Sequence, residues 1–190
     1  MKQLMRLSSE DRTVFSLVAQ AALINPFSDQ RTALDMQMAG EGPADESGLD
    51  RAIQRVRDRF EKLEQVKAAH VGAYAEEDRP ILSAASLFDV FHRCAEALDR
   101  LILEQIEAGD APCAVPFAGE SLALLSRRGF PRAESVRMFA MFYQLRRAFH
   151  FINKSLVGNS PSIRQLRMRL WNNVFTHDTR LYVRHIWERK

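Results

Sequence analysis

Apolar residues recur at helical intervals along most of the chain. The clearest run is spaced four, three, four and three residues apart, and it consists of Leu49, Ile53, Val56, Phe60 and Leu63. This spacing places the apolar side chains on one face of a long helix and the intervening charges on its other faces. Because the run covers only about two heptads, we expect the helix to pack within its own domain, and a coiled-coil dimer is the alternative.

Capping residues and breakers divide the rest of the chain into further helices. Ser8 and Ser28 are suited to accept hydrogen bonds from the first turn of a helix, and Gly129 is suited to end one. Ser160 followed by Pro161 is another start signal. The predicted helices cover residues 8–25, 28–38, 49–63, 80–108, 117–128, 131–157 and 161–175, with a Gly- and acid-rich loop at 39–48 and a last helix after a break near 176.

The segment that follows Pro131 is rich in aromatic residues. Its apolar side chains cover so much of the helix circumference that we expect a central, mostly buried helix; they are Val136, Phe139, Phe142, Tyr143, Phe149, Phe151 and Ile152. The chain contains no convincing strand alternation and no internal repeat. The sequence therefore predicts an all-α fold, a multi-helix bundle of about six to eight helices with long helices and a C-terminal helical linker.

Composition adds limits on location and partners. The 190 residues allow one sizeable core, or a core with an appendage. Two cysteines do not make a disulfide framework, and the N-terminus does not read as a signal peptide. No apolar run approaches the ~18 residues that span a bilayer. We therefore expect a cytoplasmic protein that does not enter the membrane.

Charge is distributed unevenly along the chain. Residues 127–190 hold 14 Lys and Arg against three Asp and Glu, although the net charge of the whole chain is only +3. The basic rear third could attract the acidic front, a neighbouring domain or nucleic acid, and a solvated basic face is the plainer alternative.

The sequence contains none of the common motifs for catalysis and metal binding. The chain has no phosphate-binding G-x-x-x-x-G-K-[ST] loop, no G-x-G-x-x-G, no G-x-S-x-G and no H-E-x-x-H. His92 and Cys94 are two residues apart, so on a helix they point in different directions and are poorly placed to share a metal. We expect no catalytic residue, no metal site and no cofactor in this chain, which is therefore not predicted to be an enzyme.

One small group of residues suggests a ligand site. Arg146 and Arg147 lie within the aromatic segment, with Tyr143 and His150 within about one turn of them on a helix. Aromatic rings beside guanidinium groups are suited to hold an anionic signal molecule. The alternative is that these arginines reach to the surface or pair with acidic residues of the front half.

The stretch "LVGNSPSIRQLRMRLW", residues 156–171, resembles the opening of the ATPase domain in sigma-54-dependent transcriptional activators, the bacterial enhancer-binding proteins. In that family a hydrophobic–Gly–x–Ser–Pro run opens a helix with apolar and basic residues. Val157, Gly158, Ser160 and Pro161 match the run here. Ser160 would cap this helix, and its expected packing face consists of Ile163, Leu166 and Leu170. After Trp171 the chain departs from the common pattern, because a second helix replaces the usual quick passage to a strand.

The resemblance implies two parts of the chain with different functions. Residues 1–154 would form a helical regulatory domain for signal reception, and residues 155–190 a linker and the start of an AAA+ ATPase domain that this chain lacks. ATP and Mg would belong to that missing domain, and the backbone around Val157 and Gly158 would lie near the adenine. The expected partners are the protein's own ATPase domain, sigma-54 RNA polymerase through the parent protein, an unknown signal ligand or protein, and further copies in a homo-oligomer.

Two other functions stay open from the sequence. A stand-alone helical nucleic-acid-binding module could use the basic rear third through phosphate contacts. In that case Trp171, Phe175, Tyr182 and Trp187 would more readily form a packing face than stack on bases. A helical enzyme or cofactor carrier is the remaining alternative.

Overall fold

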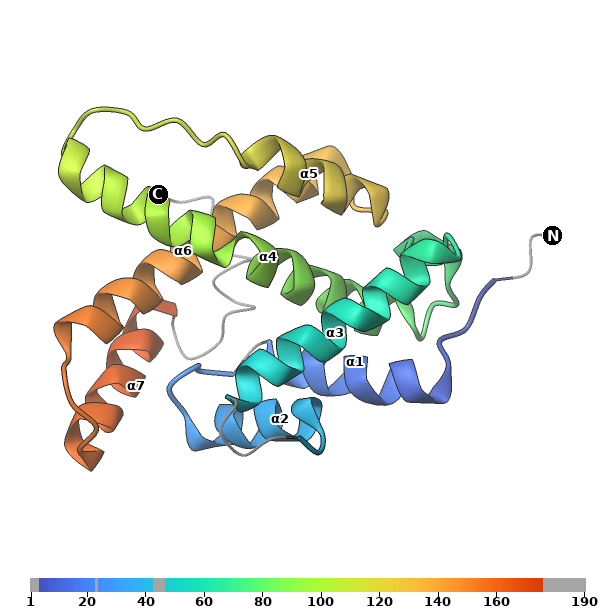
Figure 1. Ribbon diagram of the computed structural model, residues 1–190, viewed down its shortest axis with the longest axis horizontal. Helices are drawn as coiled ribbons and strands as arrows, with labels where there is room; N and C mark the ends of the chain where they lie inside the picture. Colours follow the sequence, from blue (N-terminus) through green and yellow to red (C-terminus); the bar gives the residue numbers. More distant parts are fainter. Residues whose placement is uncertain (1–3, 23, 43–46, 176–190) are drawn as a thin grey trace.

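The computed structural model describes residues 4–22, 24–42 and 47–175. These residues form seven α-helices and one 3₁₀ turn, and they contain no β-strand beyond an isolated bridge between Met5 and Tyr74, which confirms the all-α prediction (Figure 1). No helix in these ranges has the length and apolar character needed to cross a bilayer. The elements in chain order are α1 (Ser9–Ala21), α2 (Asp29–Ala39), α3 (Gly48–Gln65), η1 (Val71–Ala73), α4 (Arg79–Ala108), α5 (Ala118–Arg127), α6 (Arg132–Ser155) and α7 (Pro161–Phe175).

The predicted capping residues begin and end helices as expected. The hydroxyls of Ser8 and Ser28 accept hydrogen bonds from the first turns of α1 and α2. The Ser160 hydroxyl accepts one from the Ile163 amide at 3.3 Å at the start of α7. Gly129 follows α5 at φ +97°, a left-handed conformation that suits glycine. The helix boundaries are thus set largely by local chemistry.

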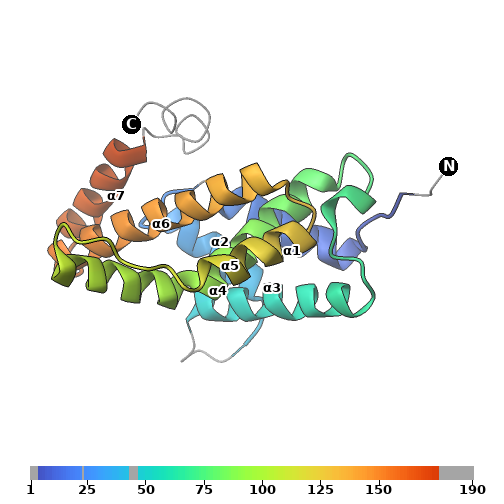
Figure 2. The ribbon, with the colours of Figure 1, turned by 90° about the horizontal axis from the view of Figure 1, so that it is seen from above.

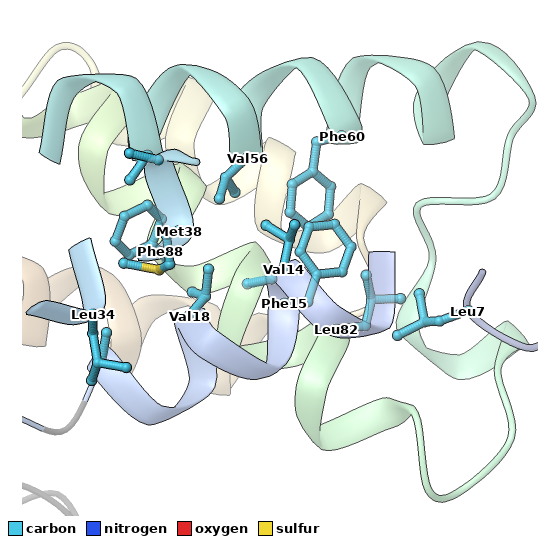
Figure 3. Close-up of a cluster of buried hydrophobic side chains, with 14 of the residues drawn as sticks. Leu7, Val14, Phe15, Val18, Leu34, Met38, Val56, Phe60, Leu82 and Phe88 are labelled. Carbon is cyan, nitrogen blue, oxygen red and sulfur yellow. The ribbon is translucent and has the colours of Figure 1, made fainter. Parts of the chain in front are cut away.

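The described residues form three hydrophobic clusters, and the first joins α1, α2, α3 and the first part of α4 (Figure 3). Phe15 of α1 and Phe60 of α3 stack at its centre, with ring centroids 5.2 Å apart. Val56 and Phe60 of α3 are buried, and the other apolar residues of the predicted stripe are partly buried against the same cluster. The stripe therefore packs within the domain, as predicted.

The other two clusters extend the fold along α4 and α6. The second cluster joins the middle of α4 to α5 and the first half of α6, with Leu98, Leu125 and Phe142 among its buried residues. The third joins the second half of α6 to α7 and to Phe27, which precedes α2. Figures 1 and 2 show α7 at the end of the molecule opposite the N-terminus of α1. Because α4 and α6 each belong to two clusters, they connect the whole fold.

The expectation that α6 is mostly buried is wrong. Only Ser135, Met141, Phe142 and Ile152 of its 24 residues are buried. Val136 and Phe151 are 47% and 40% exposed. Helix α6 contacts α4, α5 and α7, and these neighbours leave much of its surface exposed. Aromatic content indicated the capacity of this helix to pack, but not how many neighbours it has.

Candidate functional site

A groove lies between the C-terminal end of α4 and the second half of α6, and its volume is about 440 Å³. Helix α4 contributes Ile102, Gln105 and Ile106, the following loop contributes residues 109–113, and α6 contributes Tyr143, Arg147 and Phe151. The α6 residues are spaced four apart, so they form one stripe along the helix. The groove size lies within the range of small-molecule sites.

The polar groups of the groove are fixed by a contact between the two helices. The Tyr143 hydroxyl donates a hydrogen bond to Gln105 Oε1 at 2.5 Å. This bond orients the Gln105 amide, because its oxygen accepts from Tyr143. The NH₂ group of Gln105 still has two N–H donors that can bind a ligand. Two of the four residues predicted to bind a ligand, Tyr143 and Arg147, therefore lie in one groove.

Arg147 is the cation of this groove. Its side chain is exposed, and its guanidinium carbon lies 5.9 Å from the centroid of the Phe151 ring. It forms no ion pair with any residue in the described part of the chain. A guanidinium over an aromatic ring is attracted to the ring face and keeps its N–H donors available for a carboxylate or phosphate.

Arg146, the neighbouring predicted residue, is engaged elsewhere. Its guanidinium donates to both carboxylate oxygens of Asp99 on α4, at 2.7 and 2.5 Å. It also lies 5.4 Å from the ring centroid of Phe149. This bidentate pair joins α6 to α4, which corresponds to the alternative of pairing with the front half.

His150, the fourth predicted residue, does not line the groove. Its ring meets the Phe151 ring edge-on, with centroids 5.5 Å apart. Its Nε2 atom is buried and has no hydrogen-bond partner among the described residues. The structure thus separates the four residues, with two in the groove, one in an interhelical ion pair and one beside the exposed Phe151.

The stretch that resembles the ATPase opening connects α6 to α7. Val157 is 84% exposed, and Gly158 adopts a φ of +110° that turns the chain. Pro161 is the first residue of α7, directly after the Ser160 cap. The Arg167 guanidinium reaches back from α7 to the carbonyl oxygen of Leu156. The turn is therefore held at both ends, and its apolar residue points to solvent.

The packing face predicted for α7 is wrong in part. Leu166 and Leu170 are exposed, and the buried residues are Trp171 and Phe175. Trp171 lies edge-on to Phe27 at 6.1 Å between centroids. Asn25 supports this contact, because its amide donates to the carbonyl of Met168 at 2.9 Å. The α1–α2 connection selects the face of α7 that carries the large rings, which the spacing within α7 alone did not reveal.

A buried arginine, Arg128, was missed by sequence reasoning. Its side chain is 1% exposed, and its guanidinium lies 2.6 Å from the equally buried Asp89 carboxylate and 2.9 Å from that of Glu64. It also lies 3.9 Å from the centroid of the Phe60 ring. Arg128 follows α5, so it connects α5 to α3 and α4. Nothing local in the sequence indicates partners 39 and 64 residues away.

His92 and Cys94, the residues considered for catalysis or metal binding, lie in surroundings that disfavour their charged forms. Burial lowers the pKa of His92 to about 3. The imidazole packs against the Phe88 ring, with ring centroids 4.4 Å apart. Burial likewise raises the pKa of Cys94 to about 11, which suppresses its thiolate form. Within the described residues no group of three or more His, Cys, Asp or Glu could hold a metal ion.

The basic rear third is only partly described. Arg128, Arg146 and Arg167 bind groups within the protein, whereas Arg164 and Arg169 are exposed on α7. Trp171 and Phe175 form part of a packing face, as predicted. The predicted last helix lies outside the described residues, with Tyr182, Trp187 and the basic residues Arg180, Arg184, Arg189 and Lys190.

Comparison with family models, with curated proteins and with solved structures found no match to this chain.

Proposed function

We propose that this chain is the signal-reception region of a sigma-54-dependent transcription activator. A ligand in the groove between α4 and α6 changes the activity of the ATPase domain that follows. ATP, Mg and sigma-54 RNA polymerase act on that following domain. The active assembly is a homo-oligomer, because ATPase domains of this family work as rings.

The observation that carries this proposal is the continuity of α6. One unbroken helix holds the groove residues Tyr143 and Arg147 and then leads directly to the Val157–Pro161 run. From Tyr143 to the end of α6 at Ser155 the rise is roughly 18 Å at 1.5 Å per residue. A helix is stiff over that length, so a ligand that shifts or fixes α6 also moves the turn.

The turn itself is suited to receive such a change. Val157 is exposed, so its surface is available to an adjoining domain. The contact of Arg167 with the Leu156 carbonyl links the orientation of α7 to the end of α6. In the family that the stretch resembles, this backbone lies near the adenine of ATP, and a displaced α6 would therefore alter nucleotide binding.

Binding of nucleic acid receives less support from the described residues. Arg128, Arg146 and Arg167 are engaged by Asp89, Asp99 and the Leu156 carbonyl. The exposed Arg164 and Arg169 stay open to phosphates, but they are only two of the charges on which this function depends. The groove and the continuity of α6 have no part in that function. A salt titration of binding to generic duplex and single-stranded DNA distinguishes the two functions, because phosphate contacts produce a steep salt dependence.

The proposal is tested by placing residues 1–190 ahead of the ATPase core of a sigma-54 activator. We expect the fused region to change the ATPase rate about fivefold or more relative to the core alone, since allosteric coupling free energies are typically about 1–3 kcal/mol. A chimera with an unrelated helical domain of similar length is the control. Equal rates for the core, the control and the fusion would refute the proposal.

A further inference from the structure

The groove between α4 and α6 carries two charges of opposite sign. Arg147 lies on its α6 side, and Asp110 lies in the loop that follows α4. Both side chains are exposed, and neither forms an ion pair with the other or with any further described residue. Two opposite charges that share a groove and leave each other unpaired can bind a ligand that carries both an anionic and a cationic group.

The α4 end of the groove has a second source of negative potential. Helix α4 is 30 residues long and has no basic residue in its last turn. Its C-terminus at Ile106 and Gly109 lines the groove. The carbonyl groups at a helix C-terminus carry a partial negative charge, which favours a cation there. The C-terminal end of α4 and the Asp110 carboxylate therefore each favour a positively charged group of the ligand at this end of the groove.

The α6 side offers donors for a carboxylate. Arg147 presents a planar set of N–H groups that suits a bidentate contact with a carboxylate. The Gln105 amide, oriented by Tyr143, adds an N–H donor from the opposite helix. The remaining walls are apolar side chains of Ile102, Ile106 and Phe151. These walls favour a ligand with a hydrophobic body.

We propose that the groove binds a small zwitterion with an apolar body, an apolar L-α-amino acid. Its carboxylate binds Arg147 and Gln105, and its ammonium group binds Asp110 and the C-terminal carbonyls of α4. The apolar side chain packs on Ile102, Ile106 and Phe151. This assignment rests on the proposed sensory function and names the class of signal.

The test is calorimetric titration of the 190-residue chain with L-leucine and L-phenylalanine, and with two truncated forms of leucine. Isocaproate lacks the ammonium group, and isoamylamine lacks the carboxylate. We expect saturable binding of at least one amino acid, and binding about tenfold or more weaker for the matched truncated forms, because each loses a charge-assisted contact. Phenylalanine has its own truncated forms, hydrocinnamate and phenethylamine, for use if leucine does not bind.

Three variants assign the contacts. Asp110→Asn should remove the preference for the amino acid over its deaminated form, and Arg147→Gln should weaken the binding of both. Arg137→Gln on the outer part of α6 is the matched control, because Arg137 is exposed and does not line the groove. All three positions are exposed, so the thermal melts of the variants should match that of the parent chain.

Two results would overturn the assignment. Equal affinity for an amino acid and its deaminated acid would show that the groove does not recognise a zwitterion. Failure of both L-leucine and L-phenylalanine to bind would contradict the assignment, because the apolar walls are expected to hold an aliphatic or an aromatic side chain. In either case a changed ATPase rate in the fusion would leave the proposed regulatory function standing, so the two failures can be told apart.

Discussion

Replacing Arg128 by alanine removes a buried cation that joins three helices. In the native protein its guanidinium lies 2.6 Å from Asp89, 2.9 Å from Glu64 and 3.9 Å from the Phe60 ring centroid. After Arg128→Ala the carboxylate of Asp89, itself 1% exposed, retains one ion pair within the described ranges, with Arg93 at 2.8 Å. The buried Asp89 carboxylate thus keeps one of the two cations that neutralise it in the native protein.

The expected loss follows from that geometry. Breaking a buried ion pair by removing one partner typically costs about 3–5 kcal/mol. Arg93 still neutralises part of the Asp89 charge, whereas the contact with Phe60 contributes roughly a further 1 kcal/mol that is also lost. We therefore expect the free energy of unfolding to fall by about 3–4 kcal/mol. At about 2–4 °C per kcal/mol for a chain of this size, Tm falls by about 6–16 °C.

Urea unfolding followed by circular dichroism measures the change, and Glu64→Gln is the matched control. Glu64 contacts the same guanidinium, but its side chain is 41% exposed, so its neutralisation should cost about 1 kcal/mol or less. A loss below about 1 kcal/mol for Arg128→Ala, or equal losses for both variants, would refute the claim that Asp89 and Arg128 form a buried pair on which the fold depends.

Three other predictions concern single residues. The folded pKa of His92, about 3, lies below its unfolded value of 6.5, so its share of stability is present above pH 6.5 and is lost as pH falls toward 3. Unfolding measured at pH 6 and pH 5 should show about 1 kcal/mol less pH-dependent loss for His92→Gln than for the parent, and parallel profiles would contradict this. Asp78→Asn should destabilise the protein by about 1–3 kcal/mol in urea, because Asp78 is fully buried and pairs with Arg12 at 2.7 Å; an unchanged midpoint would show that the pair contributes nothing. At about pH 8 a thiol reagent should modify Cys113 in the folded protein and Cys94 only after unfolding, and equal rates would contradict the burial of Cys94.

The features that sequence predicted well depend on contacts between near neighbours. The caps at Ser8, Ser28 and Ser160 bind amides three residues further on, and Gly129 adopts the backbone conformation that glycine tolerates best. The α3 stripe has a spacing that fixes its buried face. In each case the chemistry that decides the structure lies within one or two turns of the residue.

The features that sequence predicted poorly depend on distant parts of the chain. The face of α7 is selected by Phe27, more than a hundred residues earlier, and Arg128 is held by Glu64 and Asp89 from two other helices. The groove depends on both local spacing and long-range packing. Tyr143 and Arg147 are one turn apart on one helix, so their proximity follows from the sequence, whereas Asp110 belongs to a loop whose position depends on how α4 packs against α6.

The proposed control of a sigma-54 activator ATPase by these helices is checked in the coding sequence that follows Lys190. We expect codons for an apolar strand and then for a G-x-x-x-x-G-K-[ST] loop within the next few dozen positions. A continuation of that length without such a strand and loop would contradict it, and the resemblance of the Val157–Pro161 run to an ATPase opening would then carry no function.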